Sequence, residues 1–147
     1  MAVYKLYPLQ DATLYSFYSY MNTGLDPIIE CINLNVSINP VPQVSRFLIE
    51  FDQGEINNVV DNIVGNVKFS ASLKSYIATA QGVIFDTDLE AYPISGSWNN
   101  GSGTYLDSPI TANGCSWVAR TYSGSGGENW LVDGYTNNVT GSYSSSA

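Results

Sequence analysis

Apolar and polar residues alternate along much of this chain, which is the pattern of half-buried β-strands. The clearest run is SRFLIEFD at residues 45–52. One face of that run carries three large apolar side chains, Phe47, Ile49 and Phe51. The other face carries Arg46, Leu48 and Glu50, and the apolar Leu48 indicates that this face is partly covered as well. The alternation therefore predicts a central strand with apolar residues toward a core.

Weaker alternation predicts further strands elsewhere. These are Ala2–Tyr7, Ala12–Ser16, Ile28–Val36, Val67–Thr79, Asp86–Ile94, Ser116–Tyr122 and Trp130–Val132. Turn-forming residues separate them, for example Asn22-Thr23-Gly24 and Asn99-Asn100-Gly101. Short strands at near-regular spacing favour an all-β fold, and we expect an antiparallel β-sandwich.

One segment has helical instead of strand periodicity. Between Gly54 and Gly65 the apolar residues recur three or four positions apart, as on one face of an amphipathic helix. Asp52 followed by Glu55 resembles a capping box, and Gly65 can end a helix. The sequence predicts one short helix over about residues 55–64.

The length of 147 residues fits one domain, and we expect the sandwich to occupy residues 1–120. From Thr121 onward the chain is rich in Gly, Ser, Thr, Asn and Tyr and contains no Lys or Arg. We expect residues 121–147 either to complete the sandwich or to become ordered against a partner.

The chain is acidic and carries few charges. Charged residues make up 12% of the sequence, against about 25% in ordinary soluble proteins. The formal net charge of -8, with only scattered bases, repels phosphate backbones and anionic lipids. We therefore expect neither a nucleic acid nor a membrane as a partner. A surface of uncharged polar groups suits contact with other proteins or with sugars.

The sequence contains no histidine, so it lacks the usual general base and the commonest metal ligand. Ser-His-Asp and Cys-His nucleophilic systems are excluded for that reason. The glycine-rich stretch at residues 124–127 has no lysine and no helical pattern behind it, unlike a phosphate-binding loop. Two carboxylates could hydrolyse a glycosidic bond, but thirteen acids make a chance pair unremarkable. We expect no enzyme and no catalytic residue.

The two cysteines, Cys31 and Cys115, lie far apart in the sequence and form no metal or redox motif. They are either two reduced, mostly buried thiols, the interpretation we favour, or a disulfide, which requires an oxidising compartment.

Asp86, Asp88 and Glu90 would share one face of a strand, and such hard oxygen ligands suit Ca²⁺. The alternative is a charged solvent face that discourages pairing of strand edges. Calcium is the only cofactor that the residues suggest.

Aromatic residues are the other candidates for contact with a partner. They are Tyr15, Phe17, Tyr18, Tyr20, Trp98 and Tyr105. Such rings can fill a core, form a protein interface, or stack on sugar rings.

Four segments, taken in order, resemble the DNRLRE-type β-sandwich domain, which recurs in bacteriophage virion proteins and in secreted, wall-associated proteins of bacteria and archaea. They are DATLYS at 11–16, MNTGLD at 21–26, SRFLIEFD at 45–52 and SWNNGSG at 97–103. The resemblance implies a jelly-roll sandwich related in shape to carbohydrate-binding modules, without catalytic residues. It also implies that Arg46 pairs with a buried acid and that Trp98 anchors its loop. Trp117, like the apolar face of residues 45–52, is expected to be structural.

The apparent lack of an export signal favours the virion members of that family over the secreted ones. We expect a phage structural protein, such as a fibre, neck, tail or capsid-decorating subunit, made in the host cytoplasm. It would form a homo-oligomer and dock on other virion proteins. The alternative is an extracellular or cell-surface carbohydrate-binding module that attaches to glycans.

Overall fold

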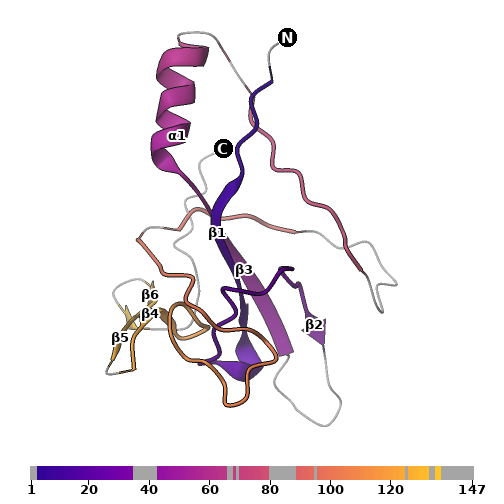
Figure 1. Cartoon of the computed structure of the whole chain (residues 1–147), viewed down its shortest axis with the longest axis vertical. Helices are drawn as coiled ribbons and strands as arrows, with labels where there is room; N and C mark the ends of the chain where they lie inside the picture. Colours follow the sequence, from indigo (N-terminus) through magenta and orange to yellow (C-terminus); the bar gives the residue numbers. More distant parts are fainter. Residues whose placement is uncertain are drawn as a thin grey trace. The chain divides into compact units, whose positions relative to one another are not determined.

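The computed structural model describes residues 3–34, 43–65, 68, 70–79, 89–94, 96–124, 126–132 and 135–136. In this part of the chain most regular elements are β-strands, and one helical segment accompanies them (Figure 1). The chain falls into two compact units. The first unit contains Met1–Leu9 and Glu50–Glu90, and the second contains Gln10–Ile49 and Ala91–Ala147.

Three strands form the main sheet, in the order β1-β3-β2 (Figure 1). Their bounds are Pro8–Tyr15 for β1, Asn33–Leu34 for β2 and Gln43–Phe51 for β3. β2 pairs antiparallel with β3, with Asn33 opposite Val44. The strand predicted over residues 45–52 is therefore confirmed as β3, and the strand predicted at Ala12–Ser16 is part of the longer β1.

Two short antiparallel pairs follow near the end of the described chain. β4 (Ala119–Tyr122) pairs with β5 (Gly127–Asn129), with an irregularity between Ala119 and Thr121. β6 (Leu131–Val132) pairs with β7 (Tyr135–Thr136). Both pairs thus belong to the same unit as most of β1 and most of β3.

The core of the second unit is built mainly from aromatic and small apolar residues. Its buried members are Ala12, Leu14, Leu48, Trp98, Cys115, Trp117 and Trp130. All three tryptophans of the chain are therefore in one cluster. The indole N–H of Trp130 donates to the carbonyl of Ser116 at 2.8 Å, so its polar group is satisfied inside the core.

The better buried face of β3 is not the one with the larger apolar side chains. Leu48 is 3% exposed, whereas Phe47, Ile49 and Phe51 are only partly buried. The reason is tertiary, because the tryptophan cluster covers the Leu48 side of the strand. Alternation predicted the strand correctly but could not predict which face the rest of the chain would cover.

The helix is confirmed and starts slightly earlier than expected. α1 (Gln53–Asn58) continues directly into the π-helical segment η2 (Val59–Val64). The backbone N–H of Glu55 donates to Asp52 Oδ1 at 3.0 Å, as the capping pattern predicts. Gly65 ends the helix with a φ of 59°. The carboxylate of Glu55 accepts a hydrogen bond from the hydroxyl of Tyr4 at 3.1 Å.

Several predicted strands are wrong in the described residues. Residues 3–7, 70–79 and 89–94 are extended or irregular without strand pairing, and only Asn33–Leu34 of the run at 28–34 forms a strand. The strands predicted at Ser116–Tyr122 and Trp130–Val132 begin later, at Ala119 and Leu131. Alternation shows that a segment could be half-buried, but a strand also needs a neighbour to complete its hydrogen bonds.

A buried amide joins three distant segments of the second unit. Asn22 is fully buried, and its Nδ2 donates to the carbonyls of Asn100 at 2.6 Å and Cys115 at 2.8 Å. Its Oδ1 accepts from the backbone N–H groups of Gly103 at 2.8 Å and Gly24 at 3.3 Å. The side chain therefore satisfies backbone groups that the surrounding loops could not satisfy by themselves.

Glycine is required where these segments meet. Gly101 has a φ of 75°, and a Cβ placed on it would lie 2.5 Å from Asn22 Oδ1. Gly114 has a φ of 81° and would direct a Cβ into the backbone of Gly101. A side chain at either position would force the loops away from the amide of Asn22.

Replacing Asn22 by Ala should destabilise the second unit strongly, because several buried backbone groups lose their partners at once. We expect the free energy of unfolding to fall by about 3 kcal/mol or more, since each unsatisfied buried group costs about 1–3 kcal/mol. Urea unfolding followed by tryptophan fluorescence would measure the loss. Asn33→Ala, at an exposed strand position, is the matched control and should change little. Equal stability of the two variants would contradict the role given to Asn22.

Candidate functional site

Four aromatic rings gather at one end of β1, and we call them the aromatic cluster. Tyr15 ends β1, Phe17 and Tyr18 come from the 3-10 turn η1 (Ser16–Tyr18), and Tyr105 comes from a distant loop. The ring centroid of Tyr15 lies 5.4 Å from that of Phe17 and 5.2 Å from that of Tyr105. Tyr18 lies 4.8 Å from Phe17 and 6.1 Å from Tyr105. These are the tilted and edge-to-face arrangements that aromatic pairs prefer.

The aromatic cluster has a buried base and an exposed rim. Tyr15 is fully buried, Phe17 is partly buried, and Tyr18 and Tyr105 are 43% and 42% exposed. The turn is closed by the N–H of Met21, which donates to the carbonyl of Tyr18 at 2.9 Å. The cluster therefore exposes two tyrosine rings on a fixed support.

Two carboxylates lie beside the rings. The hydroxyl of Tyr15 donates to Glu30 Oε2 at 2.6 Å, and the N–H of Tyr105 donates to Asp26 Oδ1 at 3.1 Å. The N–H of Glu30 donates in turn to Thr13 Oγ1 at 3.0 Å, which fixes the segment that carries the carboxylate. We call the rim of Phe17, Tyr18 and Tyr105, together with Asp26 and Glu30, the acidic-aromatic patch.

The electrostatics agree with this geometry. Burial, together with the bond to Glu30 and the charge of that residue, raises the pKa of Tyr15, so its hydroxyl stays protonated as a donor. Burial also raises the pKa of Asp26, as do the charges of Glu30 and Asp107, while the N–H of Tyr105 acts in the opposite direction. The patch is a site of concentrated negative charge next to aromatic rings.

Asp107, near the patch, stabilises the turn that carries Tyr105. Its carboxylate accepts from the side chain of Thr111, and from the N–H of Thr104 at 3.0 Å and the hydroxyl of Thr104 at 2.9 Å. These bonds favour the charged form and lower its pKa. They hold the turn that presents Tyr105.

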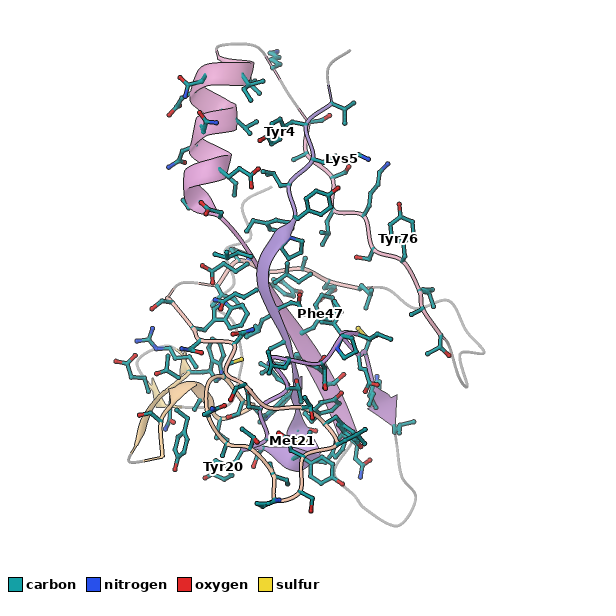
Figure 2. All side chains as sticks on the ribbon, viewed as in Figure 1. Tyr4, Lys5, Tyr20, Met21, Phe47 and Tyr76 are labelled. Carbon is teal, nitrogen blue, oxygen red and sulfur yellow. The ribbon has the colours of Figure 1, made fainter. Side chains whose placement is uncertain are left out.

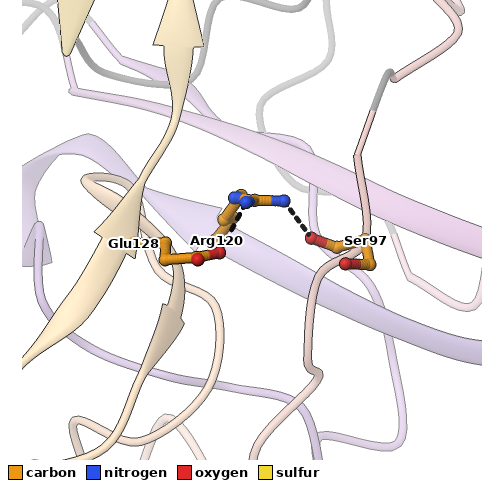
Figure 3. A network of polar contacts seen from close by, with 3 residues as sticks. All are labelled: Ser97, Arg120 and Glu128. Carbon is orange, nitrogen blue, oxygen red and sulfur yellow. Dashed lines mark hydrogen bonds and ion pairs between the residues drawn. The ribbon is translucent and has the colours of Figure 1, made fainter.

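The bases of this unit, Arg46 and Arg120, have partners of their own. Arg120 forms a 2.5 Å ion pair with Glu128 and donates to the carbonyl of Ser97 at 3.0 Å (Figure 3). Arg46 is exposed, and its guanidinium carbon lies 5.0 Å from the ring centroid of Trp117. In the described residues Arg46 thus stacks on an aromatic ring, and the expected pairing with a buried acid is absent.

The structure brings together four of the aromatic residues selected from the sequence and separates two others. Tyr20 is 62% exposed but takes part in none of the ring contacts found among the described residues (Figure 2). Trp98 is only 8% exposed and lies in the core, so it cannot offer its ring to a partner. Tyr15 is likewise too deeply buried for direct contact and serves as the base of the cluster.

The calcium hypothesis falls mostly outside the described residues. Asp86 and Asp88 lie outside them, and Glu90 is exposed. Within the described ranges, no group of three or more His, Cys, Asp or Glu residues is arranged to hold a metal ion. Calcium therefore stays a prediction from the sequence.

The expectation of two mostly buried thiols is right for one cysteine only. Both cysteines are free, but Cys115 is buried in the core whereas Cys31 is exposed. Burial raises the pKa of the Cys115 thiol to about 12.

Sequence reasoning missed Asp26 and Glu30. Asp26 lies just before the strand predicted at Ile28–Val36, and Glu30 lies within it. Neither belongs to a motif, and the fold alone brings them to Tyr105 and Tyr15.

Comparison of the chain with protein-family models, with curated proteins and with solved structures gave no match. The resemblance to the DNRLRE-type domain therefore stays a prediction. Among the described residues, none of the helices is long and apolar enough to cross a membrane.

Substitution of two neighbouring carboxylates should have opposite effects on stability. Asp26→Asn removes a charge that folding disfavours and retains an oxygen for the N–H of Tyr105, so the melting temperature at pH 7 should rise by about 1–3 °C. Asp107→Asn removes a charge that three hydrogen bonds favour, so the melting temperature should fall.

The pH dependence gives an independent check on the same pair. The pKa of Asp26 is raised on folding, so its charged carboxylate destabilises the folded state. This destabilisation is relieved as the pH falls through the raised pKa. The pKa of Asp107 is lowered, so its stabilisation is lost as the pH falls from the ordinary value of 3.8 toward the lowered one. Melting curves of both variants between pH 7 and acidic pH, recorded by circular dichroism, would test these signs. Shifts of the same sign at pH 7 would refute the assignment.

The two thiols should differ sharply in reactivity. At pH 8 an aromatic disulfide reagent should modify Cys31 much faster than Cys115, which should react only when the core opens. Burial raises the pKa of both thiols, to about 12 for Cys115, so the difference in access decides the order. Cys31→Ser should abolish the fast phase, and Cys115→Ser should leave it unchanged. Two equally fast phases in the folded protein would show that Cys115 is not buried.

Proposed function

We propose that this chain is a non-catalytic assembly domain of a phage virion, such as a fibre, neck, tail or capsid-decorating subunit. The observation that carries the proposal is the acidic-aromatic patch, in which exposed tyrosine rings stand on a buried aromatic base. Tyrosine is enriched at protein interfaces because a large ring with a polar tip gives contact area at a low entropic cost.

The rings of the patch are held in fixed positions, as in a binding interface and unlike the side chains of a loose surface loop. Phe17 and Tyr18 follow β1 directly, and Tyr105 is held through its N–H by Asp26. Rings that are already positioned lose little freedom on binding, so more of the contact energy remains as affinity.

The low fraction of charged residues, the missing histidine and the resemblance to virion domains support the remainder of the proposal. A protein that acts by docking needs complementary surfaces and no reactive groups. Other virion proteins and further copies of this chain are the partners that we propose.

We also propose that the complete fold is a jelly-roll-like sandwich. The antiparallel pairs β2-β3, β4-β5 and β6-β7 supply part of such a fold. The resemblance to the DNRLRE-type domain supports the rest of this part of the proposal.

Removing the exposed rings tests the assembly proposal. Wild-type protein should form a defined oligomer or join virus particles, as seen by mass photometry or electron microscopy. The double variant Tyr18→Ala/Tyr105→Ala should weaken assembly by about tenfold or more, because aromatic anchors contribute most of the energy of an interface. Tyr20→Ala is the matched control, since Tyr20 is exposed but lies outside the cluster. A strictly monomeric wild-type protein that is absent from particles would contradict the proposal.

A second function, attachment to cell-surface glycans, is favoured by one feature of the same patch. Sugar sites combine a flat aromatic face with polar groups for hydroxyls, and here Asp26 lies beside Tyr105 and Glu30 beside Tyr15. If the chain attaches to glycans, the wild-type protein should bind on a glycan array. The Tyr18→Ala variant should lose this binding, and the Tyr20→Ala variant should retain it. Absence of binding to every glycan class on the array would count against this second function.

A further inference from the structure

We propose that the acidic-aromatic patch of one copy binds the extended segment around Lys74 of a second copy. This inference rests on the proposed assembly function and identifies the contact that would produce it. We call residues 70–79 the Lys74 segment.

The patch provides the acceptor for a cation. Asp26 accepts from the N–H of Tyr105, and Glu30 accepts from the hydroxyl of Tyr15 at the base of the aromatic cluster. An ammonium group between carboxylates and aromatic faces gains both charge pairing and a cation–π contribution. The two bases of the same unit are held elsewhere, Arg120 by Glu128 and Arg46 over Trp117. The contacts described for the patch therefore involve acids and rings without a base to balance them.

The Lys74 segment provides the donor. Every residue from 70 to 79 is exposed and has no strand partner among the described residues. Leu73, Tyr76 and Ile77 are 58%, 89% and 85% exposed, and Figure 2 shows the side chain of Tyr76 standing away from the chain. Exposed apolar side chains of this size favour burial against a partner. No acid occurs between Lys68 and Thr79, so the segment is cationic.

The spacing of Lys74 and Tyr76 fits a patch that combines carboxylates with aromatic rings. In an extended chain alternate residues share a face, so Lys74 and Tyr76 point to the same side. Their Cα atoms would be about 7 Å apart, since a strand rises about 3.3 Å per residue. Tyr76 can then pack on the rim rings while the ammonium of Lys74 reaches Glu30 or Asp26.

A contact of this kind joins two different surfaces of the same chain. Such a head-to-tail contact builds a ring if the rotation closes and a filament if it does not. Both suit the ordered repetition of a virus particle. A second copy is the occupant that the charges favour, because the chain carries the acidic acceptor and the cationic donor in separate units.

Charge reversal would test the contact in the full-length protein. Lys74→Glu should weaken self-association by about tenfold or more, as expected for reversal of one interfacial charge pair. Lys68→Glu makes the same charge change six positions earlier and should alter association by less than about twofold. Mixing Lys74→Glu protein with Glu30→Lys protein should restore association, because each junction again joins opposite charges.

Cross-linking gives a measurement that does not depend on variants. A carbodiimide joins a lysine amine to a carboxylate in direct contact, and an equal mixture of ¹⁵N-labelled and unlabelled wild-type protein reports whether the two groups are on different copies. Heavy–light peptides joining Lys74 to Glu30 or Asp26 would support the proposal.

The remaining outcomes separate this inference from the proposed function. A Lys74 link found only within one isotope would show that the segment folds onto its own patch, which overturns binding between copies. An oligomer that lacks the link and tolerates Lys74→Glu would overturn the inference and leave assembly intact. A monomer that neither cross-links nor joins particles would overturn both.

Discussion

The buried side-chain amide of Asn22 joins loop segments that the sequence separates by many residues. Its two donor bonds reach the carbonyls of Asn100 and Cys115, and its oxygen accepts from Gly103. An apolar side chain of that size would leave these backbone groups without partners inside the protein. Each such group lowers the free energy of unfolding, which is small for any domain, so several of them together would unfold it. No described strand includes Tyr105, and the bonds from Asn22 to Asn100 and Gly103 attach the loop that carries it to the rest of the unit.

The geometry of the acidic-aromatic patch depends on the hydrogen bonds of Asn22. β1 leads through η1 to Phe17 and Tyr18, while the bonded loop delivers Tyr105 to the same place. Thr13 and Thr23 add a second buried link, since the hydroxyl of Thr23 donates to the carbonyl of Thr13 at 2.5 Å. The result is a fixed aromatic surface with the carboxylates of Asp26 and Glu30 at its side.

The two units differ in how they are stabilised. The second unit has a core of three tryptophans with Leu14, Leu48 and Cys115, whereas no described residue of the first unit is buried. The helix of the first unit has a good N-cap and a glycine stop, yet a helix of this length is marginal in water without an apolar face to pack on. A partner that covers the exposed apolar residues of the first unit would supply what its own packing lacks.

The sequence by itself determined the local features. Alternation placed β3, the helical stripe and Asp52 placed the helix, and the absence of histidine removed the common catalytic mechanisms. These depend on neighbours along the chain or on composition. Only the tertiary structure decided that Leu48 and not Phe47 faces the core, that Trp98 is buried, and that Asp26 and Glu30 stand beside Tyr105 and Tyr15. Each of these depends on which distant segments meet, and local periodicity carries no information about contacts between residues so far apart in the chain.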